Sequence, residues 1–304
     1  MANFTIRVPA SSANLGPGFD SLGLALSLYL HVSVLTTESD SLQMRIISTS
    51  PGLTRDVDKN LLTVTIANTL LKFNKAPKKL IQLEIDSEIP LGSGLGSSST
   101  AVIAGVMIAN EIGQLELNKD ALLNLCCDIE GHPDNICPGF LGNLTVSVNA
   151  KPCIYLTIPF PNEIKIIAAT PSYELATEKA RKALPDMYPR EDVVYNIQRA
   201  SALPHVLSNP SHWHLLKEVL QDKIHQTYRL PFLPGFSDIL SMSIDGCLGT
   251  FVSGAGPTAL VLYISNEEII IDFVKKAFQK YNHTTTIRKL QVDTDGASLK
   301  INSN

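Results

Sequence analysis

A short segment that combines closely spaced glycines with a run of hydroxyl side chains constrains the fold of this chain more than any other. The segment reads Pro90, Leu91, Gly92, Ser93, Gly94, Leu95, Gly96, Ser97, Ser98, Ser99 and Thr100. Apolar and polar residues alternate over residues 80–85 before it, which predicts a half-buried strand. The almost wholly apolar residues 101–112 after it predict a buried helix. We therefore expect a loop that joins a strand to a helix N-terminus.

Such a loop suits a polyphosphate. Glycine lets the backbone approach an anion closely and adopt positive φ. The first amides of a helix have no intrahelical acceptor, and the helix dipole adds partial positive charge there. The hydroxyls of residues 97–100 could donate to phosphate or give an oxygen to Mg²⁺. The alternative is a serine-capped helix behind a flexible turn.

Better-known nucleotide loops do not fit this segment. The Walker A pattern needs a longer glycine spacing and a lysine, and residues 90–100 contain no lysine. The dinucleotide pattern G-x-G-x-x-G fails because Gly94 is followed by Gly96 and then by serines. The H-R-D and D-F-G signatures of protein kinases are absent from the sequence.

The size of the chain predicts two domains. It has 304 residues, of which 44% are apolar. We place the boundary where Pro159 and Pro161 interrupt predicted strands, which gives domains 1–161 and 162–304. In the second domain, a strand at residues 249–253, a strand at 258–264, a helix at 267–281 and a strand at 285–292 form a β-β-α-β order. This order indicates a ferredoxin-like α+β domain.

Charge and composition exclude several classes of partner. The formal net charge of −4 gives no bulk attraction to nucleic acid or to anionic membranes. The apolar run over residues 22–35 is too short for a membrane helix, and no targeting segment is visible, so we expect a cytoplasmic protein. None of the five cysteines forms a C-x-x-C pair. We expect them to be buried, reduced thiols rather than metal ligands.

Other polar clusters are candidates for a site. Residues 9–20 form a turn-rich segment with Asn14 and Asp20, which could line a pocket or simply cap a helix. Residues 130–135 end a predicted helix and include Glu130, His132 and Asn135, which could bind Mg²⁺ and orient a hydroxyl or could be a solvated helix end.

A third glycine-rich segment and two arginines complete the candidates. Residues 253–257, with Gly254, form a tight turn that could meet the other glycine loops. Arg181 and Arg229 are possible carboxylate clamps, because a guanidinium group matches a carboxylate with two hydrogen bonds. His225 has no recognised metal spacing and is expected to be structural.

Together these segments resemble the GHMP kinases, a superfamily of small-molecule kinases. Residues 90–100 match the motif P-x-x-x-G-L-G-S-S-x-x throughout. Residues 9–20 are similar to the form P-A-[ST]-[ST]-A-N-L-G-x-G-F-D of the homoserine-phosphorylating branch, and lack the G-E-H of galactokinases and mevalonate kinases. Residues 130–135 resemble the E-G-H-P-D-N of that branch, and residues 253–257 the superfamily's S-G-A-G-P. The resemblance runs from about residue 5 to about residue 264.

The resemblance implies a two-domain α+β fold and a set of ligands. The N-terminal domain would be ribosomal-protein-S5-like with a left-handed crossover, and the C-terminal domain ferredoxin-like. ATP would lie on residues 90–100, with Asn60 near adenine, and Mg²⁺ on Ser98 and Glu130, where Ser97 or Ser99 could replace Ser98. The residues that would contact L-homoserine are Asn14, Asp20, His132, Asn135, Thr177, Arg181, Arg229 and Gly254. Of these, Asn135 and Arg181 would also be catalytic.

The implied reaction is phosphorylation of the homoserine side-chain hydroxyl, and Asn135 would orient that hydroxyl because an amide cannot act as a base. Two alternatives stay open. One is a GHMP kinase for another small alcohol, and the other is a nucleotide-binding regulator or RNA-binding protein with the S5-like fold. A homodimer is compatible with the sequence.

Overall fold

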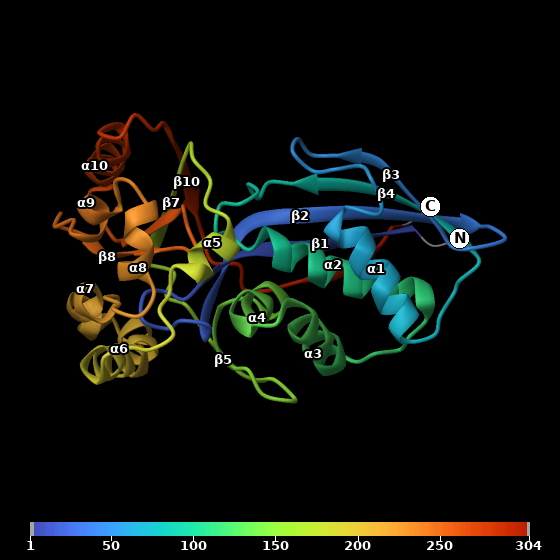
Figure 1. Ribbon diagram of the computed structural model, residues 1–304, viewed down its shortest axis with the longest axis horizontal. Helices are drawn as coiled ribbons and strands as arrows, with labels where there is room; N and C mark the ends of the chain where they lie inside the picture. Colours follow the sequence, from blue (N-terminus) through green and yellow to red (C-terminus); the bar gives the residue numbers. More distant parts are fainter. Residues whose placement is uncertain (1–2, 303–304) are drawn as a thin grey trace.

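The chain forms two sheets, each with helices packed on it (Figure 1). The computed structural model describes residues 3–302, without the side chain of Thr177. The strands are β1 (Asn3–Ala13), β2 (Leu22–Glu38), β3 (Gln43–Thr49), β4 (Lys79–Ser87), β5 (Leu144–Val148), β6 (Ile154–Ile158), β7 (Lys165–Pro171), β8 (Cys247–Val252), β9 (Ala259–Tyr263), β10 (Thr285–Leu290) and β11 (Ser298–Ile301). The helices are α1 (Leu61–Lys72), α2 (Ser97–Gly113), α3 (Lys119–Glu130), α4 (Pro133–Leu141), α5 (Thr177–Lys182), α6 (Arg190–Ser208), α7 (Leu216–Val219), α8 (Gln226–Arg229), α9 (Phe236–Leu240) and α10 (Glu267–Gln279), with 3₁₀ turns η1 (Pro210–Leu215) and η2 (Leu230–Phe232).

The first sheet carries α1 to α4 and forms the N-terminal lobe. Its strand order is β11-β1-β2-β4-β3, and β5 and β6 extend it from β2. Only β3 and β4 are parallel neighbours among the described strands, as expected when a helix, here α1, connects two strands. Side chains such as Ile6, Leu24 and Ile103 are fully buried between this sheet and its helices. The buried face of α2 explains its nearly continuous apolar sequence.

The second sheet forms the C-terminal lobe with α5 to α10. Its four strands are all antiparallel in the order β10-β7-β9-β8. Along the chain the elements follow the order β7, α5 to α9, β8, β9, α10 and β10. The β-β-α-β order at its end is the one predicted for this part and is typical of ferredoxin-like domains. Phe236 and Phe278 bring α9 and α10 together edge to face, with ring centroids 5.6 Å apart.

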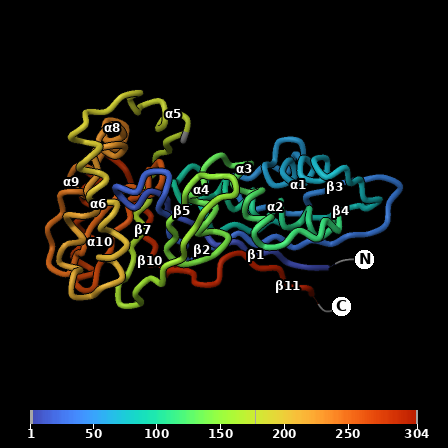
Figure 2. Tube along the Cα trace, turned by 90° about the horizontal axis from the view of Figure 1, so that it is seen from below, coloured from blue at the N-terminus to red at the C-terminus, as the bar shows by residue number. Residues whose placement is uncertain are grey.

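The end of β1 carries the N-terminal lobe into contact with the C-terminal lobe. The amide of Gly254 donates to the carbonyl of Ala13 at 3.2 Å. The loop that follows, residues 14–20, lies among the helices of the C-terminal lobe, as Figure 2 shows for the blue tube beside α6. Segments from opposite ends of the sequence therefore meet where the two lobes join.

Three elements were missed from the sequence. The strands β3 and β11 were not predicted, although residues 43–46 and 298–301 alternate polar and apolar side chains, and α4 was not distinguished from the end of the helix before it. Gly131 does end α3 with positive φ, but Pro133 then starts a new helix at its first position, where proline is well tolerated.

The predicted division into domains 1–161 and 162–304 stays a prediction. The first sheet contains β11, which pairs antiparallel with β1 through partners such as Phe4 and Ile301. The last strand of the chain thus lies in the N-terminal lobe, which a single boundary does not describe. The handedness of the crossover from β3 to β4 also stays a prediction.

The structure also shows the lengths of the apolar helices and the state of the cysteines. Within residues 3–302, no helix combines the length and the apolar character needed to cross a bilayer. All five cysteines are free; four are buried and Cys247 is partly exposed.

Candidate active site

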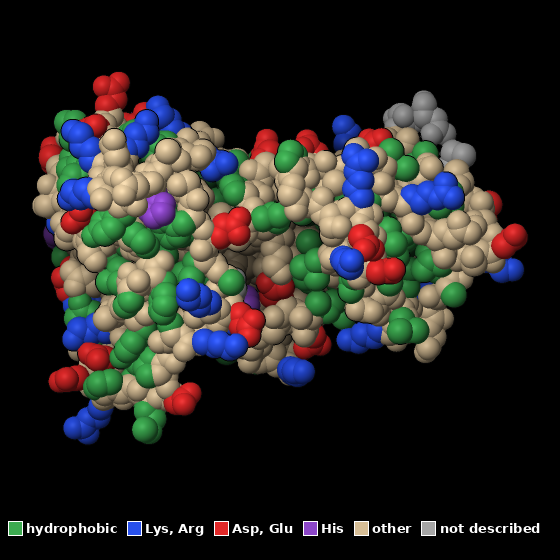
Figure 3. Space-filling view, turned by 45° about the horizontal axis from the view of Figure 1, so that its top comes forward, with side chains coloured by type: hydrophobic (Ala, Val, Ile, Leu, Met, Phe, Trp, Pro, Cys, Tyr) green, Lys and Arg blue, Asp and Glu red, His purple; other side chains and the backbone are tan. Residues whose placement is uncertain are grey.

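A cavity of about 340 Å³ lies where the lobes meet, and most of the predicted site residues line it. The space-filling view is hollowed between the two lobes (Figure 3). The predicted residues along the wall of the cavity are Asn14, Asp20, Gly92, Ser93, Gly94, Gly96, Ser97, Ser98, Ser99, Glu130, His132, Asn135, Arg181, Arg229 and Gly254. The structure therefore brings six separate segments of the sequence to one place.

A few predicted residues lie elsewhere. Leu95 is fully buried in the core, and Pro90 and Leu91 line a separate groove on the other side of the loop. The Thr100 hydroxyl is used within its helix, donating to the carbonyl of Ser97 at 2.9 Å. The Thr177 side chain, predicted to contact the substrate, lies outside the described part of the chain.

Asn60, expected near adenine, is the N-cap of α1. Its Oδ1 accepts from the amide of Leu62 at 3.1 Å, and its Nδ2 donates to the carbonyl of Thr54 at 2.8 Å. It lines a small cavity of about 30 Å³ that also contacts Ser97 and Thr100 of the glycine loop. Asn60 thus lies beside the loop but not on the wall of the main cavity.

The glycine loop turns its carbonyls away from the cavity. The carbonyls of Ser93, Gly94 and Leu95 accept hydrogen bonds from Thr258, Ser253 and Ser11, at 3.1, 2.7 and 3.2 Å. In contrast, none of the amides of residues 91–99 donates a hydrogen bond within the described chain. The loop is therefore held by its acceptors, while its donors remain available for an anion.

Backbone conformation in this loop requires glycine. Gly94 has φ of +79°, and a Cβ there would lie 2.2 Å from the carbonyl oxygen of Ser253. Gly96, the N-cap of the 17-residue helix α2, has φ of +74° and no side chain that could cap the helix. The first turn of α2 also contains no acidic residue. No acidic side chain of the first turn therefore neutralises the positive end of the helix dipole.

Glu130, at the end of α3, reaches the start of α2. Its Oε1 accepts from Ser99 Oγ at 2.7 Å, and its Oε2 accepts from Ser98 Oγ at 3.4 Å. The hydroxyl of Ser98 is exposed to the cavity, whereas Ser99 is almost fully buried. One carboxylate and two hydroxyls thus form a group of hard oxygen atoms beside the open amides of the loop.

The segment at the start of α4 places two polar side chains on the wall. His132 Nδ1 lies 2.7 Å from Oδ1 of the buried Asp134, and this hydrogen bond raises the pKa of His132 against the effect of its burial. Asn135 accepts a hydrogen bond at Oδ1 from Ser11 Oγ at 2.9 Å. Because Oδ1 is already engaged, the amide of Asn135 presents N–H donors to the cavity.

Asp20 and Arg181 form an ion pair on the wall of the cavity. Arg181 Nη1 and Nη2 donate to the two carboxylate oxygens at 3.2 and 2.9 Å. Both side chains remain more than a third exposed, so this pair is open to exchange with a ligand. Asn14 supports the geometry: its Oδ1 accepts from the amide of Asp20 at 3.1 Å, and its Nδ2 donates to the carbonyl of Gly254 at 2.9 Å.

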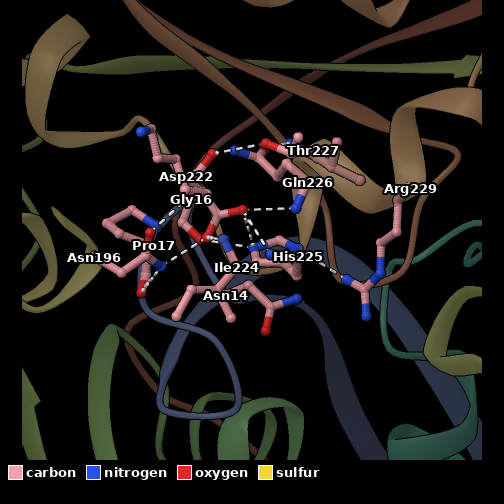
Figure 4. A network of polar contacts seen from close by, with 12 residues as sticks. Asn14, Gly16, Pro17, Asn196, Asp222, Ile224, His225, Gln226, Thr227 and Arg229 are labelled. Atoms are coloured by element: carbon pink, nitrogen blue, oxygen red, sulfur yellow. Dashed lines mark hydrogen bonds and ion pairs between the residues drawn. The ribbon is translucent and has the colours of Figure 1, made fainter. Parts of the chain in front are cut away.

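Arg229, at the end of α8, is the second guanidinium of the cavity and is almost completely buried. Nη1 donates to the carbonyl of Gly254 at 3.0 Å and to His225 Nδ1 at 2.9 Å (Figure 4). Burial, with the charge of Arg181 nearby, lowers the pKa of Arg229 to about 10, so it stays charged at neutral pH. The Nη2 atom makes no hydrogen bond to any described residue.

A buried polar network holds His225 in place beneath this arginine (Figure 4). His225 Nε2 donates to the carbonyl of Gly16 at 2.7 Å. The carboxylate of Asp222 accepts from the amides of His225 and Gln226 at 2.9 and 2.6 Å and from Asn196 Nδ2 at 2.7 Å. Asp222 thus caps the short helix α8 and fixes the direction in which Arg229 enters the cavity.

The sequence reasoning missed four residues that shape the site. His225 was read as structural, yet it contacts a predicted site residue; its spacing of four residues before Arg229 on one helix was the available signal. Phe19 lies between the two arginines, with the Arg181 and Arg229 guanidinium carbons 5.8 and 5.4 Å from its ring centre. Asp134 and Ser11 act through His132 and Asn135, and nothing in their sequence positions indicated those contacts.

Comparisons with known proteins identify the family of this chain. The family described as GHMP kinases N terminal domain matches residues 60–143. The homoserine kinase of Aquifex aeolicus is 38% identical over 97% of this chain and 98% of its own length. That of Schizosaccharomyces pombe is 36% identical over 99% of both chains.

Solved structures show the same fold over nearly the whole chain. A homoserine kinase from Cytophaga hutchinsonii superposes with a TM-score of 0.86 at 26% identity, covering 99% of this chain and 98% of its own. A galactokinase from Lactococcus lactis superposes with a TM-score of 0.69 at 14% identity, covering 97% and 95%, which shows the shared fold alone. The extent and identity of the sequence matches decide the assignment: this chain belongs to the homoserine kinase family of the GHMP kinases.

Proposed function

We propose that this protein transfers the γ-phosphoryl group of ATP to the side-chain hydroxyl of L-homoserine, forming O-phospho-L-homoserine for threonine biosynthesis. One observation carries the proposal. The unpartnered amides of the glycine loop face, in the same cavity, one carboxylate and two guanidinium groups that could hold a small amino acid. A phosphate donor and an amino-acid acceptor would thus bind side by side.

The zwitterionic end of the substrate would enter the pair formed by Asp20 and Arg181. Its ammonium group replaces Arg181 on the Asp20 carboxylate, and its carboxylate takes the released guanidinium. The Nη2 atom of the buried Arg229 gives a second donor to that carboxylate, because its Nη1 is already fixed by Gly254 and His225. Each charge then keeps an opposite partner, so binding does not leave a buried charge unpaired.

The loop would hold the phosphates of ATP, with Asn60 near the adenine. Phosphoryl transfer proceeds through a loose transition state, so positioning and charge stabilisation dominate its catalysis. The open amides of residues 91–99 and the start of α2 point donors at the place where negative charge develops. No lysine is needed for this arrangement, in agreement with the absence of a Walker A motif.

The oxygen atoms of Glu130, Ser98 and Ser99 fit a magnesium ion. They lie together beside the loop, and carboxylate and hydroxyl oxygens are suitable ligands for this hard cation. Mg²⁺ at this place would neutralise charge on the β- and γ-phosphate oxygens. Within this set, Glu130 supplies the negative charge and the exposed Ser98 a neutral oxygen, while Ser99 orients the carboxylate.

Asn135 would orient the reacting hydroxyl without taking its proton. Ser11 occupies Oδ1, so the amide donates through Nδ2 and holds the hydroxyl oxygen towards the phosphate. The proton then leaves to the transferred phosphate itself. Replacement of Asn135 by Ala should lower kcat, and an Asn135→Asp variant with a higher turnover and an unchanged pH profile would contradict this role. An unchanged kcat in the Ala variant would contradict the orienting role.

The decisive experiment measures ADP release with different acceptors. L-homoserine, mevalonate and shikimate are supplied separately with ATP and Mg²⁺, and the product is identified by phosphorus NMR. We expect homoserine to be phosphorylated at least a hundredfold more efficiently in kcat/KM than the others. A preference for another alcohol would assign the chain to a different GHMP activity, and ATP binding without any turnover would indicate a regulator.

We further propose a cytoplasmic homodimer. The free state of all five cysteines supports a reducing compartment. The strand β6 pairs only with β5 among the described strands and exposes Ile154 and Leu156 by 57% and 64%. A second copy pairing along this edge would cover both side chains. Sedimentation of the protein and of a Leu156→Lys variant tests this, because the substitution should yield monomers.

A further inference from the structure

Three cysteines from separate parts of the N-terminal lobe converge in the interior. Cys127 lies on α3, Cys137 on α4, and Cys153 immediately before β6. Their sulfur atoms all lie within 4.8 Å of one another, and all three residues are buried. α3 and α4 pack against each other, as Figure 1 shows. Neither the glycine loop nor the amino-acid pocket uses these thiols.

The spacing of the sulfurs suits a single metal ion. With a Zn–S bond of about 2.3 Å, tetrahedral thiolate ligands lie about 3.8 Å apart. Sulfurs already within 4.8 Å therefore need to move by only about 1 Å to surround one ion. A disulfide would join only two of them and leave the third thiol buried beside it.

The backbone around the cluster is well fixed. The amide of Cys153 donates to Oδ1 of Asn124 on α3 at 2.6 Å, which ties the chain before β6 to that helix. The three sulfur atoms are already held within 4.8 Å of one another in this frame. A preformed cluster reduces the loss of conformational freedom when a ligand binds.

We propose that Cys127, Cys137 and Cys153 form a three-thiolate site for a thiophilic d¹⁰ metal ion such as Zn²⁺ or Cu⁺. Thiolate ligands select such ions over Mg²⁺, which prefers oxygen. Binding forms three metal–sulfur bonds and releases the three thiol protons to solvent. The proposed magnesium site at Glu130 is chemically distinct, so the two ions do not compete.

Two of the three cysteines flank residues 130–135, the segment that lines the active-site cavity, in the sequence. Cys127 precedes Glu130 by one helical turn on α3, and Cys137 follows Asn135 on α4. A metal ion joined to both cysteines ties these helices together on either side of residues 130–135. It would thereby limit the movement of Glu130, His132 and Asn135.

Titration of the full-length, reduced protein with Cd²⁺ tests the site. Cd²⁺ bound to thiolates gives a charge-transfer band in the ultraviolet, and we expect one ion per chain. Zn²⁺ should displace Cd²⁺, and excess Mg²⁺ should not. Cys127→Ser, Cys137→Ser and Cys153→Ser should each weaken Cd²⁺ binding at least tenfold, while Cys126→Ser and Cys247→Ser, matched controls, should bind as the wild type does.

A second measurement uses the wild-type protein and does not depend on variants that fold. A metal ion that binds only the folded state raises Tm by mass action. We expect equimolar Zn²⁺ to raise Tm and equimolar Mg²⁺ to leave it unchanged. Cadmium binding that survives in the three Cys→Ser variants, binding lost in the Cys247→Ser control, or an unchanged Tm with Zn²⁺ would each overturn the proposal. None of these readouts depends on kinase activity.

Discussion

His225 Nδ1 accepts a hydrogen bond from Arg229 Nη1 at 2.9 Å, while His225 Nε2 donates to the carbonyl of Gly16 at 2.7 Å. Each contact fixes the role of one ring nitrogen, since a guanidinium can only donate and a carbonyl can only accept. The imidazole is therefore neutral, with its proton on Nε2. The histidine links the loop after β1 to the second arginine of the cavity.

Substitution of His225 should affect substrate binding in a way that depends on which nitrogen is replaced. In His225→Asn, the side-chain amide oxygen can still accept the hydrogen bond from Arg229. In His225→Gln, the longer side chain places its amide near Gly16, and Arg229 loses its acceptor. We expect His225→Gln to raise the KM for homoserine about tenfold, as for loss of a hydrogen bond to a charged group. Steady-state kinetics with each substrate varied separately measure this.

The same pair of variants contains its control. His225→Asn should raise the KM for homoserine less than His225→Gln does, and neither should alter the KM for ATP by more than about threefold, because Arg229 is proposed to contact homoserine and not ATP. Equal effects of the two variants would show that the histidine acts through packing and not through its acceptor nitrogen.

Stability should decline at mildly acidic pH because of this histidine. Burial lowers the pKa of His225 below its ordinary value of 6.5, with Arg229 acting in the same direction and Asp222 opposing it. Below pH 6.5 the unfolded chain takes up a proton that the folded chain refuses, so the free energy of unfolding falls by up to about 1.4 kcal/mol per pH unit. Urea unfolding between pH 7.5 and 5.5 measures the decline.

The comparison with His225→Asn isolates this effect. His132 has a raised pKa and contributes in the opposite direction, since its stabilisation is complete at low pH and is lost as the pH rises through its folded-state pKa. Both proteins keep His132, so the difference between them reports His225. A wild type that loses no more stability on acidification than the Asn variant would refute the assignment of a neutral, buried His225.

Two glycines of the loop should respond differently to alanine. At Gly94 a Cβ would lie 2.2 Å from the Ser253 carbonyl oxygen, so the backbone itself must shift. At Gly92 the nearest atom is 3.8 Å away, and only the positive φ of +60° opposes the substitution. We expect Gly94→Ala to reduce the free energy of unfolding by about 3 kcal/mol or more, and Gly92→Ala by about 1 kcal/mol.

Denaturant unfolding and the KM for ATP measure both effects. Gly94→Ala should also raise the KM for ATP, because the displaced backbone misdirects the open amides of the loop. Equal stability of the two variants would mean that the approach of Ser253 to Gly94 does not constrain the loop.

The oxygen atoms near the loop should control the magnesium requirement. Glu130→Gln keeps the shape of the side chain but removes its charge, so we expect kcat to fall by about a hundredfold and half-maximal activity to need more Mg²⁺. Ser98→Ala should raise the magnesium requirement with a smaller loss of kcat. Glu268→Gln, an exposed substitution in the first turn of α10, is the control. Normal magnesium dependence in Glu130→Gln would remove this residue from the metal site.

Much of the site could be predicted because its chemistry lies in short, contiguous segments. The sequence around Gly94 and Gly96 indicated a loop before a helix, and Glu130 and Asn135 lay in one compact motif. Asn118, an N-cap of a type that sequence patterns indicate, accepts from the amide of Ala121 at 2.9 Å. Local hydrogen bonding and periodicity decide such features, and both can be read along the chain.

What could not be predicted depends on contacts between distant residues. The hydrogen bond from Ser11 to Asn135 joins β1 to α4, and the bidentate pair of Asp20 and Arg181 joins segments 161 residues apart. No local pattern records such partners. The cysteines show the same limit: their sequence spacing argued against a shared ligand, yet the fold places three of them together.

The return of β11 to the edge of β1 has a consequence for synthesis of the protein. The amide of Asn302 donates to the carbonyl of Asn3 at 2.9 Å, so residues at the two ends of the described chain are neighbours. On the ribosome, the N-terminal lobe emerges first, but β1 lacks its outer partner until residue 301 has been released. Strand β1 therefore stays available for pairing with other nascent chains until β11 has been synthesised, which is a reason to expect that chaperones attend its folding.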